Sequence, residues 1–175
     1  PPALIIAPEL PPQQGRTEIR DRLDPLIAAG GPTVVLQPIV DLATGVRVGA
    51  EALSRFPAEW GMAPDVCFAE AHSIGSGHVL ELLALERAAE HLARVDGYVA
   101  MNVSPATLLD PRCVALFERL PAARLVVGLS RHEPGVDHRV ARTCVHHLSR
   151  TQPVKELVAI GRVQDVFVRV AAMRL

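Results

Sequence analysis

The chain has few aromatic residues and no excess of either charge. Aromatic residues make up 3% of its 175 residues, and 18 basic residues are balanced by 19 acidic ones, for a formal net charge of −1. Non-specific binding to nucleic acid relies on a field of basic residues, and single strands are held by stacking on aromatic rings. Because the composition supplies neither, it argues against a nucleic-acid partner.

Cysteines are also scarce, and no segment stays apolar for long. The three cysteines are widely spaced and form no C-x-x-C pair, which argues against a disulfide framework or zinc knuckle and favours a reducing compartment. No run approaches the ~20 apolar residues of a membrane helix. The proline-rich opening lacks the basic start and long apolar stretch of a signal peptide. We therefore expect a soluble, cytoplasmic protein with no membrane partner.

Apolar residues, in contrast, are plentiful. They make up 49% of the chain, which at this length is enough for one domain with a sizeable core. Residues 1–15 form a proline-rich lead-in, and we expect residues 16–175 to form a single domain.

Hydrophobic periodicity predicts an α/β fold. Strands alternate with helices from Tyr98 onward, which is typical of parallel βα units. Pro25 is expected to shorten or interrupt the first helix. We predict strands at 33–40, 46–53, 98–103, 124–129 and 156–160, and helices at 16–29, 65–74, 78–95, 112–120, 139–150 and 163–175.

The first three strands carry polar residues that a purely structural apolar strand would not need. Gln37 precedes a proline in the first, Glu51 lies in the second, and Asn102 lies near the end of the third. In barrel enzymes the active site is at the C-terminal ends of the strands, and carboxylate and amide oxygens suit Mg²⁺ or Mn²⁺. Each residue also has a structural interpretation: Gln37 as an ordinary strand-end residue, and Asn102 as part of a turn that Ser104 caps.

Three segments together are more specific than any one of them. QPIVDLATG (37–45), GAEALSRF (49–56) and MNVSP (101–105) resemble the EAL domain family in order and spacing. The resemblance is clear over 33–134 and weak over 135–175. It implies a TIM-like (β/α) barrel, with the second strand antiparallel to the others, that linearises cyclic di-GMP with divalent metals.

The resemblance also implies roles for individual residues. Glu51 and Asn102 would bind metal, while Gln37, Leu53 and Arg55 would contact the cyclic dinucleotide. An arginine there is chemically reasonable, because its guanidinium fork matches phosphate oxygens. The reversed second strand would bring Glu51 to the same mouth as the strand-end residues. The alternative for Arg55 is an ordinary surface position.

Later positions depart from the family's pattern. Gly128 and Arg131 stand where the fourth strand of the family has glutamates, and no Asp-Asp strand follows. The only lysine, Lys155, has a context that does not match the catalytic lysine of the family. In a weaker alignment of the tail, Ile160 replaces a further glutamate. Three explanations stay open for residues 135–175: a deletion of about two βα units, an unrelated tail, or a chain with omitted residues.

These losses predict a degenerate and incomplete EAL-type barrel. A two-metal reaction needs two cations about 3.5–4 Å apart, each with about six oxygen ligands, and one carboxylate with one amide holds such a pair poorly. We therefore expect no cofactor, or Mg²⁺ or Mn²⁺ if any site persists.

The predicted function is protein interaction or binding of cyclic di-GMP without hydrolysis, with an active phosphodiesterase as the alternative. An incomplete barrel exposes strand edges, so a homo-oligomer or a partner protein is expected to complete it.

Overall fold

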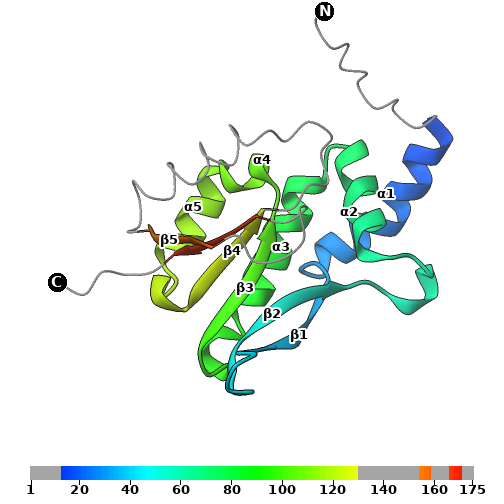
Figure 1. Cartoon of the computed structure of the whole chain (residues 1–175). Helices are drawn as coiled ribbons and strands as arrows, with labels where there is room; N and C mark the ends of the chain where they lie inside the picture. The colour runs from blue at the N-terminus through cyan, green and yellow to red at the C-terminus, as the bar shows by residue number, and fades with distance from the viewer. Residues whose placement is uncertain (1–12, 130–153, 159–165, 171–175) are drawn as a thin grey trace, which may run out of the picture.

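Six strands form one mixed sheet, with the helices on one of its faces (Figure 1). The computed structural model describes residues 13–129, 154–158 and 166–170. The strands are β1 (Thr33–Val40), β2 (Arg47–Arg55), β3 (Tyr98–Val103), β4 (Leu125–Leu129), β5 (Val154–Val158) and β6 (Val166–Val170). The helices are α1 (Gln13–Ala28), α2 (Pro64–Ser73), α3 (Gly77–Ala89), α4 (Pro105–Leu108) and α5 (Pro111–Glu118), with 3₁₀ turns at Ala58–Trp60, Leu92–Arg94 and Ala122–Arg124.

Strands β1 and β2 form an antiparallel hairpin around the turn at residues 41–46. Asp41 Oδ1 accepts hydrogen bonds from the backbone N–H groups of Ala43, at 3.0 Å, and Thr44, at 2.8 Å. Gly45 has a φ of 69°, which side chains disfavour but glycine adopts readily. This local geometry reverses the chain and fixes the register, in which Gln37 lies opposite Glu51.

The directions of the strands differ from the expectation. Strands β2, β3 and β4 are parallel to one another, and β1, the first strand, runs antiparallel to them, as β6 also does. The prediction that the second strand is the reversed one was therefore wrong. The pattern of apolar residues fixes which residues form a strand and which face they share, but it does not fix the strand's direction.

The end of the described chain also differs from the expectation. Residues 163–175 were predicted as a helix, but Val166–Val170 forms β6, which pairs antiparallel with both β4 and β5. This segment reads Val-Phe-Val-Arg-Val, and β-branched and aromatic residues fit a pleated strand. The strand predicted at 156–160 is present as β5, two residues earlier. The helix predicted at 139–150 lies outside the described residues.

Helix α1 continues through Pro25 instead of stopping there. Apolar residues pack on both sides of the proline: Leu23 is fully buried, and Leu26 and Ile27 pack against the same cluster. Tertiary packing of one apolar face supplies most of the stability of a helix in a protein, and here it outweighs the lost hydrogen bond. The helix ends just before two glycines with positive φ, Gly30 and Gly31.

The main core lies between the sheet and the helices that cover it. Leu85 of α3, Met101 of β3, Phe117 of α5 and Val127 of β4 are all within this buried cluster. A second cluster joins α1, α2 and the start of α3. The opposite face of the sheet is not covered by any described helix (Figure 1).

The sheet does not close on itself. Strands β1 and β5 lie at its two ends, so the described residues form an open α/β sheet rather than a complete barrel. This architecture is that of an incomplete TIM-like barrel. None of the described helices has the length and apolar character needed to cross a membrane.

Candidate functional site

Three of the polar residues singled out from the sequence lie on the face of the sheet that no described helix covers, which we call the open face. Successive side chains of a strand point to opposite faces. Because Leu36, Ala52 and Met101 pack toward the helix-side core, their neighbours Gln37, Glu51 and Asn102 face the other way. These residues come from β1, β2 and β3, and the fold therefore brings them together as predicted.

The position of Gln37 within its strand was predicted incorrectly. It lies in the middle of β1, not at a strand end, and pairs directly with Glu51. Since β1 is the reversed strand, its C-terminal end is opposite the ends of β2 and β3. Gln37 reaches the site through cross-strand pairing, which places paired β-carbons about 4.5–5.5 Å apart.

Glu51 and Asn102 contact each other directly. Asn102 Nδ2 donates a hydrogen bond of 2.8 Å to Glu51 Oε1, which joins β2 to β3 on the open face. Asn102, the only asparagine of the chain, is exposed, whereas Glu51 is half-buried. The bond orients both side chains toward the same region, so these two predicted metal-binding residues form one constellation.

The next strand contributes no side chain to this constellation. Gly128 of β4 pairs with Asn102 in the parallel register, and Phe167 of β6 is paired with Gly128 on its other side. A carboxylate at position 128 would lie beside Asn102, and the glycine leaves that place without a ligand. The other two positions at which the family's glutamates are lost, Arg131 and Ile160, lie outside the described residues.

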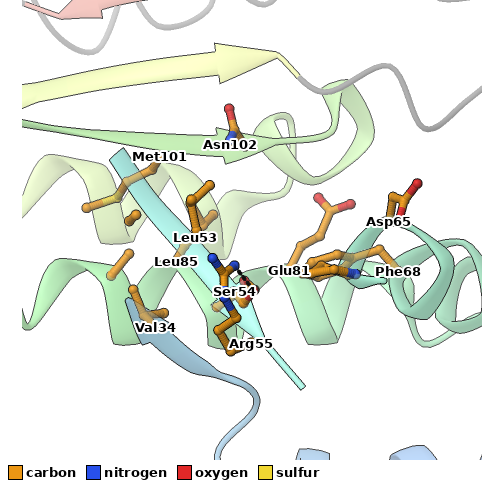
Figure 2. A pocket seen from close by; sticks show the side chains of 14 residues that line it. Val34, Leu53, Ser54, Arg55, Asp65, Phe68, Glu81, Leu85, Met101 and Asn102 are labelled. Carbon is orange, nitrogen blue, oxygen red and sulfur yellow. Dashed lines mark hydrogen bonds between the residues drawn. The ribbon is translucent and has the colours of Figure 1, made fainter. Parts of the chain in front are cut away.

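Leu53 and Arg55 line a cavity of about 150 Å³ at the C-terminal end of β2. The backbone pairing of β2 with β3 ends at Ala52 and Met101, and the cavity lies just beyond that point, with Asn102 also in its wall. Figure 2 shows the guanidinium of Arg55 beside Ser54, whose carbonyl accepts a hydrogen bond of 2.9 Å from Arg55 Nη1. The cavity thus connects two of the predicted ligand contacts to Asn102.

Two acidic residues of this cavity were missed from the sequence. Asp65, at the start of α2, and Glu81, on α3, line the same wall, and Figure 2 shows both near the cavity. Charged residues within an amphipathic helix ordinarily indicate the solvent-exposed face, and Glu81 instead is 5% exposed. Neither residue belongs to a strand motif, so the sequence contained no specific signal for them.

Comparison with known proteins identifies the family. A family model of the EAL domain matches residues 20–152, which is most of the chain. No curated protein matches it significantly. The chain therefore belongs to the EAL domain family, as a partial member, and this membership points to cyclic di-GMP signalling.

Within residues 13–129, 154–158 and 166–170, the side chains around Glu51 and Asn102 do not by themselves fit the pair of Mg²⁺ or Mn²⁺ ions that EAL domains normally use. On the open face, Glu51 offers one carboxylate and Asn102 one amide. No group of three or more histidine, cysteine, aspartate or glutamate side chains converges as a metal site anywhere in the described part of the chain. Each hard cation takes about six oxygen ligands, so this donor set is too small and too weakly charged for two.

Proposed function

We propose that this chain is a receptor that binds cyclic di-GMP without hydrolysing it. One observation carries the proposal: Gln37, Glu51 and Asn102 share one face beside the cavity of Leu53 and Arg55, while Gly128 occupies the adjoining position on β4. This arrangement supports a site that keeps the residues expected to contact the ligand and has no carboxylate at one position expected to bind metal. The family's association with cyclic di-GMP supplies the ligand class.

The shape of the site sets how the ligand would lie. Ligand pockets usually measure about 300–1,000 Å³, so a cavity of about 150 Å³ takes only one part of a cyclic dinucleotide. Arg55 is exposed at its edge and has the fork geometry that pairs with a phosphate. The remaining part of the ligand would lie over the open face, near Gln37 and Asn102.

Calorimetric titration with cyclic di-GMP, with and without Mn²⁺, tests the proposal. Arg55→Ala should weaken binding by about 1.5–3 kcal/mol, the usual value of a hydrogen bond to a charged group, or roughly ten- to a hundredfold in Kd. Arg47→Ala is the matched control, because Arg47 is an exposed arginine at the other end of β2. Chromatography of the same mixtures should detect no linear dinucleotide.

Two outcomes would contradict the receptor. Equal affinities for Arg55→Ala and Arg47→Ala would remove the assigned phosphate contact. Steady formation of linear dinucleotide that Glu51→Ala abolishes would identify an active phosphodiesterase, the alternative function, in spite of the small donor set.

A second candidate function is protein interaction through the edge of the sheet. None of the described strands pairs with the outer edge of β1. Val35, Val40, Leu42 and Val46, four of the six exposed large apolar residues of the described chain, lie on the β1–β2 hairpin. A second copy or a partner protein that covers this edge would complete the wall of the barrel, and absence of cyclic di-GMP binding would favour this function over the receptor.

A further inference from the structure

Glu81 is a buried carboxylate at the junction of three helices and the end of β3. It is 5% exposed and lies on α3, facing α2 and the turn from β3 to α4. Its Oε1 is 2.7 Å from Nε2 of His72, near the end of α2, and its Oε2 accepts a hydrogen bond of 2.9 Å from the backbone N–H of Ser104. Both carboxylate oxygens are therefore held by other elements of the fold.

Ordinary packing does not require a carboxylate at this place. Removing an ionised group from water costs free energy unless hydrogen bonds and opposite charges compensate it. Burial raises the pKa of Glu81, but hydrogen bonds from His72, Ser104 and Thr107 outweigh that effect, so its pKa lies below the ordinary value of 4.5. The site is therefore built to keep the carboxylate charged.

The backbone bond to Ser104 connects Glu81 to the candidate site. Ser104 caps α4, with its Oγ accepting a bond of 3.2 Å from the Thr107 N–H, and both residues are fully buried. Asn102 is only two residues before Ser104, at the end of β3, and it lines the same cavity as Glu81. A fixed Ser104 amide limits how the last residues of β3 can turn, and thus where the Asn102 side chain points.

We propose that Glu81 is a positioning residue, whose carboxylate holds the β3–α4 turn and thereby sets the orientation of Asn102 toward Glu51 and the ligand. The effect on ligand affinity rests on the proposed function, whereas the effect on Asn102 does not. Altering a residue that orients a metal ligand typically costs about 10–100-fold in metal affinity or activity, and we expect an effect at the lower end of that range for an organic ligand. Glu81→Gln should therefore weaken cyclic di-GMP binding roughly tenfold, and should add nothing when Asn102 is already alanine.

The chain offers a direct measurement, because Asn102 is its only asparagine. Labelling with ¹⁵N-asparagine gives one backbone amide signal and one side-chain NH₂ pair, and the latter reports the hydrogen bond to Glu51. Glu81→Gln should shift both sets of signals. Glu86→Gln is the matched control, since Glu86 is exposed on the same helix, and should leave them in place.

A second variant keeps the test decisive if Glu81→Gln does not fold. His72→Gln keeps a hydrogen-bond donor near Glu81 but removes the ring, and His72 is 23% exposed and therefore more tolerant of change. It should shift the Asn102 signals in the same direction by a smaller amount. Unchanged Asn102 signals in a folded Glu81→Gln or His72→Gln protein would overturn the inference. Shifted signals in a protein that does not bind cyclic di-GMP would retain it and reject the receptor instead.

Discussion

Individual side chains on the open face of the sheet decide which chemistry the site can support. Glu51 supplies a single carboxylate, Asn102 a neutral amide, and Gly128 no side chain. Affinity for hard cations rises with the number of charged oxygen ligands. Among the described residues of this face, Gly128 is therefore the position at which an added carboxylate would most directly enlarge the set of oxygen ligands.

Gly128→Glu should create a better cation site. The new carboxylate would lie on β4 beside Asn102, so we expect affinity for Mn²⁺ to rise roughly tenfold or more as a second charged ligand is added. Titration calorimetry or electron paramagnetic resonance of Mn²⁺ measures the change. Gly128→Ala is the control, because it adds a β-carbon without a charge. Equal Mn²⁺ affinities of the two folded variants would show that position 128 does not face the Glu51–Asn102 pair.

The sequence pointed to Glu51 and Asn102 as candidate site residues because each lies within a short, recognisable segment of the chain. Glu51 and Asn102 lie in the short motifs at 49–56 and 101–105 that carry the family resemblance, and the parallel strands β2 and β3 bring these two positions together. Glu81 could not be found in this way. Its burial depends on His72 and Ser104, which are 9 and 23 residues distant and meet it only in the folded chain.

At the scale of elements, one buried carboxylate links α2, α3 and the start of α4. Its partners His72 and Ser104 lie on different elements. Gly77, at the start of α3, leaves room for the imidazole of His72, because a β-carbon at position 77 would be 2.2 Å from His72 Nδ1. The hydrogen bonds of the Glu81 carboxylate therefore join these elements to one another.

Stability should depend on pH through this carboxylate. The pKa of Glu81 is lower in the folded chain than its ordinary value of 4.5, so the unfolded chain binds the proton more readily. Its contribution is fully present above pH 4.5 and is lost as pH falls through the folded pKa. The free energy of unfolding can be measured with urea at several pH values from about 5.5 to about 3.5. Over this range it should fall less for Glu81→Gln than for the parent chain. Glu86→Gln should follow the parent, and parallel curves for all three proteins would contradict the assignment.

Elements were easier to predict than their arrangement. Thr33–Val40 is the predicted strand to the residue, since a short apolar run bounded by glycines and a turn leaves little freedom. The reversed direction of β1 and the antiparallel insertion of β6 beside β4 depend on pairing between distant segments. Periodicity within one segment carries no information about its partner, and for that reason both were missed.

At the scale of the whole molecule, the open sheet leaves one of its outer strands available for pairing. Strand β1 has eight residues and no described neighbour on its outer side. Exposed strand edges pair with other chains unless charges or prolines prevent it. Two copies related by a two-fold axis would place β1 against β1, since such an interface uses the same surface of both subunits.

We expect the protein to be larger than a monomer in solution, with the β1 edge at the interface. Val40→Lys would put a charge on that edge, far from Arg55, and should shift the mass measured by multi-angle light scattering toward that of a monomer. Val66→Lys is a close control, because Val66 on α2 is 44% exposed and Val40 is 47% exposed. A monomeric parent chain at all concentrations would contradict pairing of identical copies and leave a different protein as the partner. An equal decrease in the measured mass of both variants would place the interface elsewhere, because Val40 lies on the sheet edge and Val66 does not.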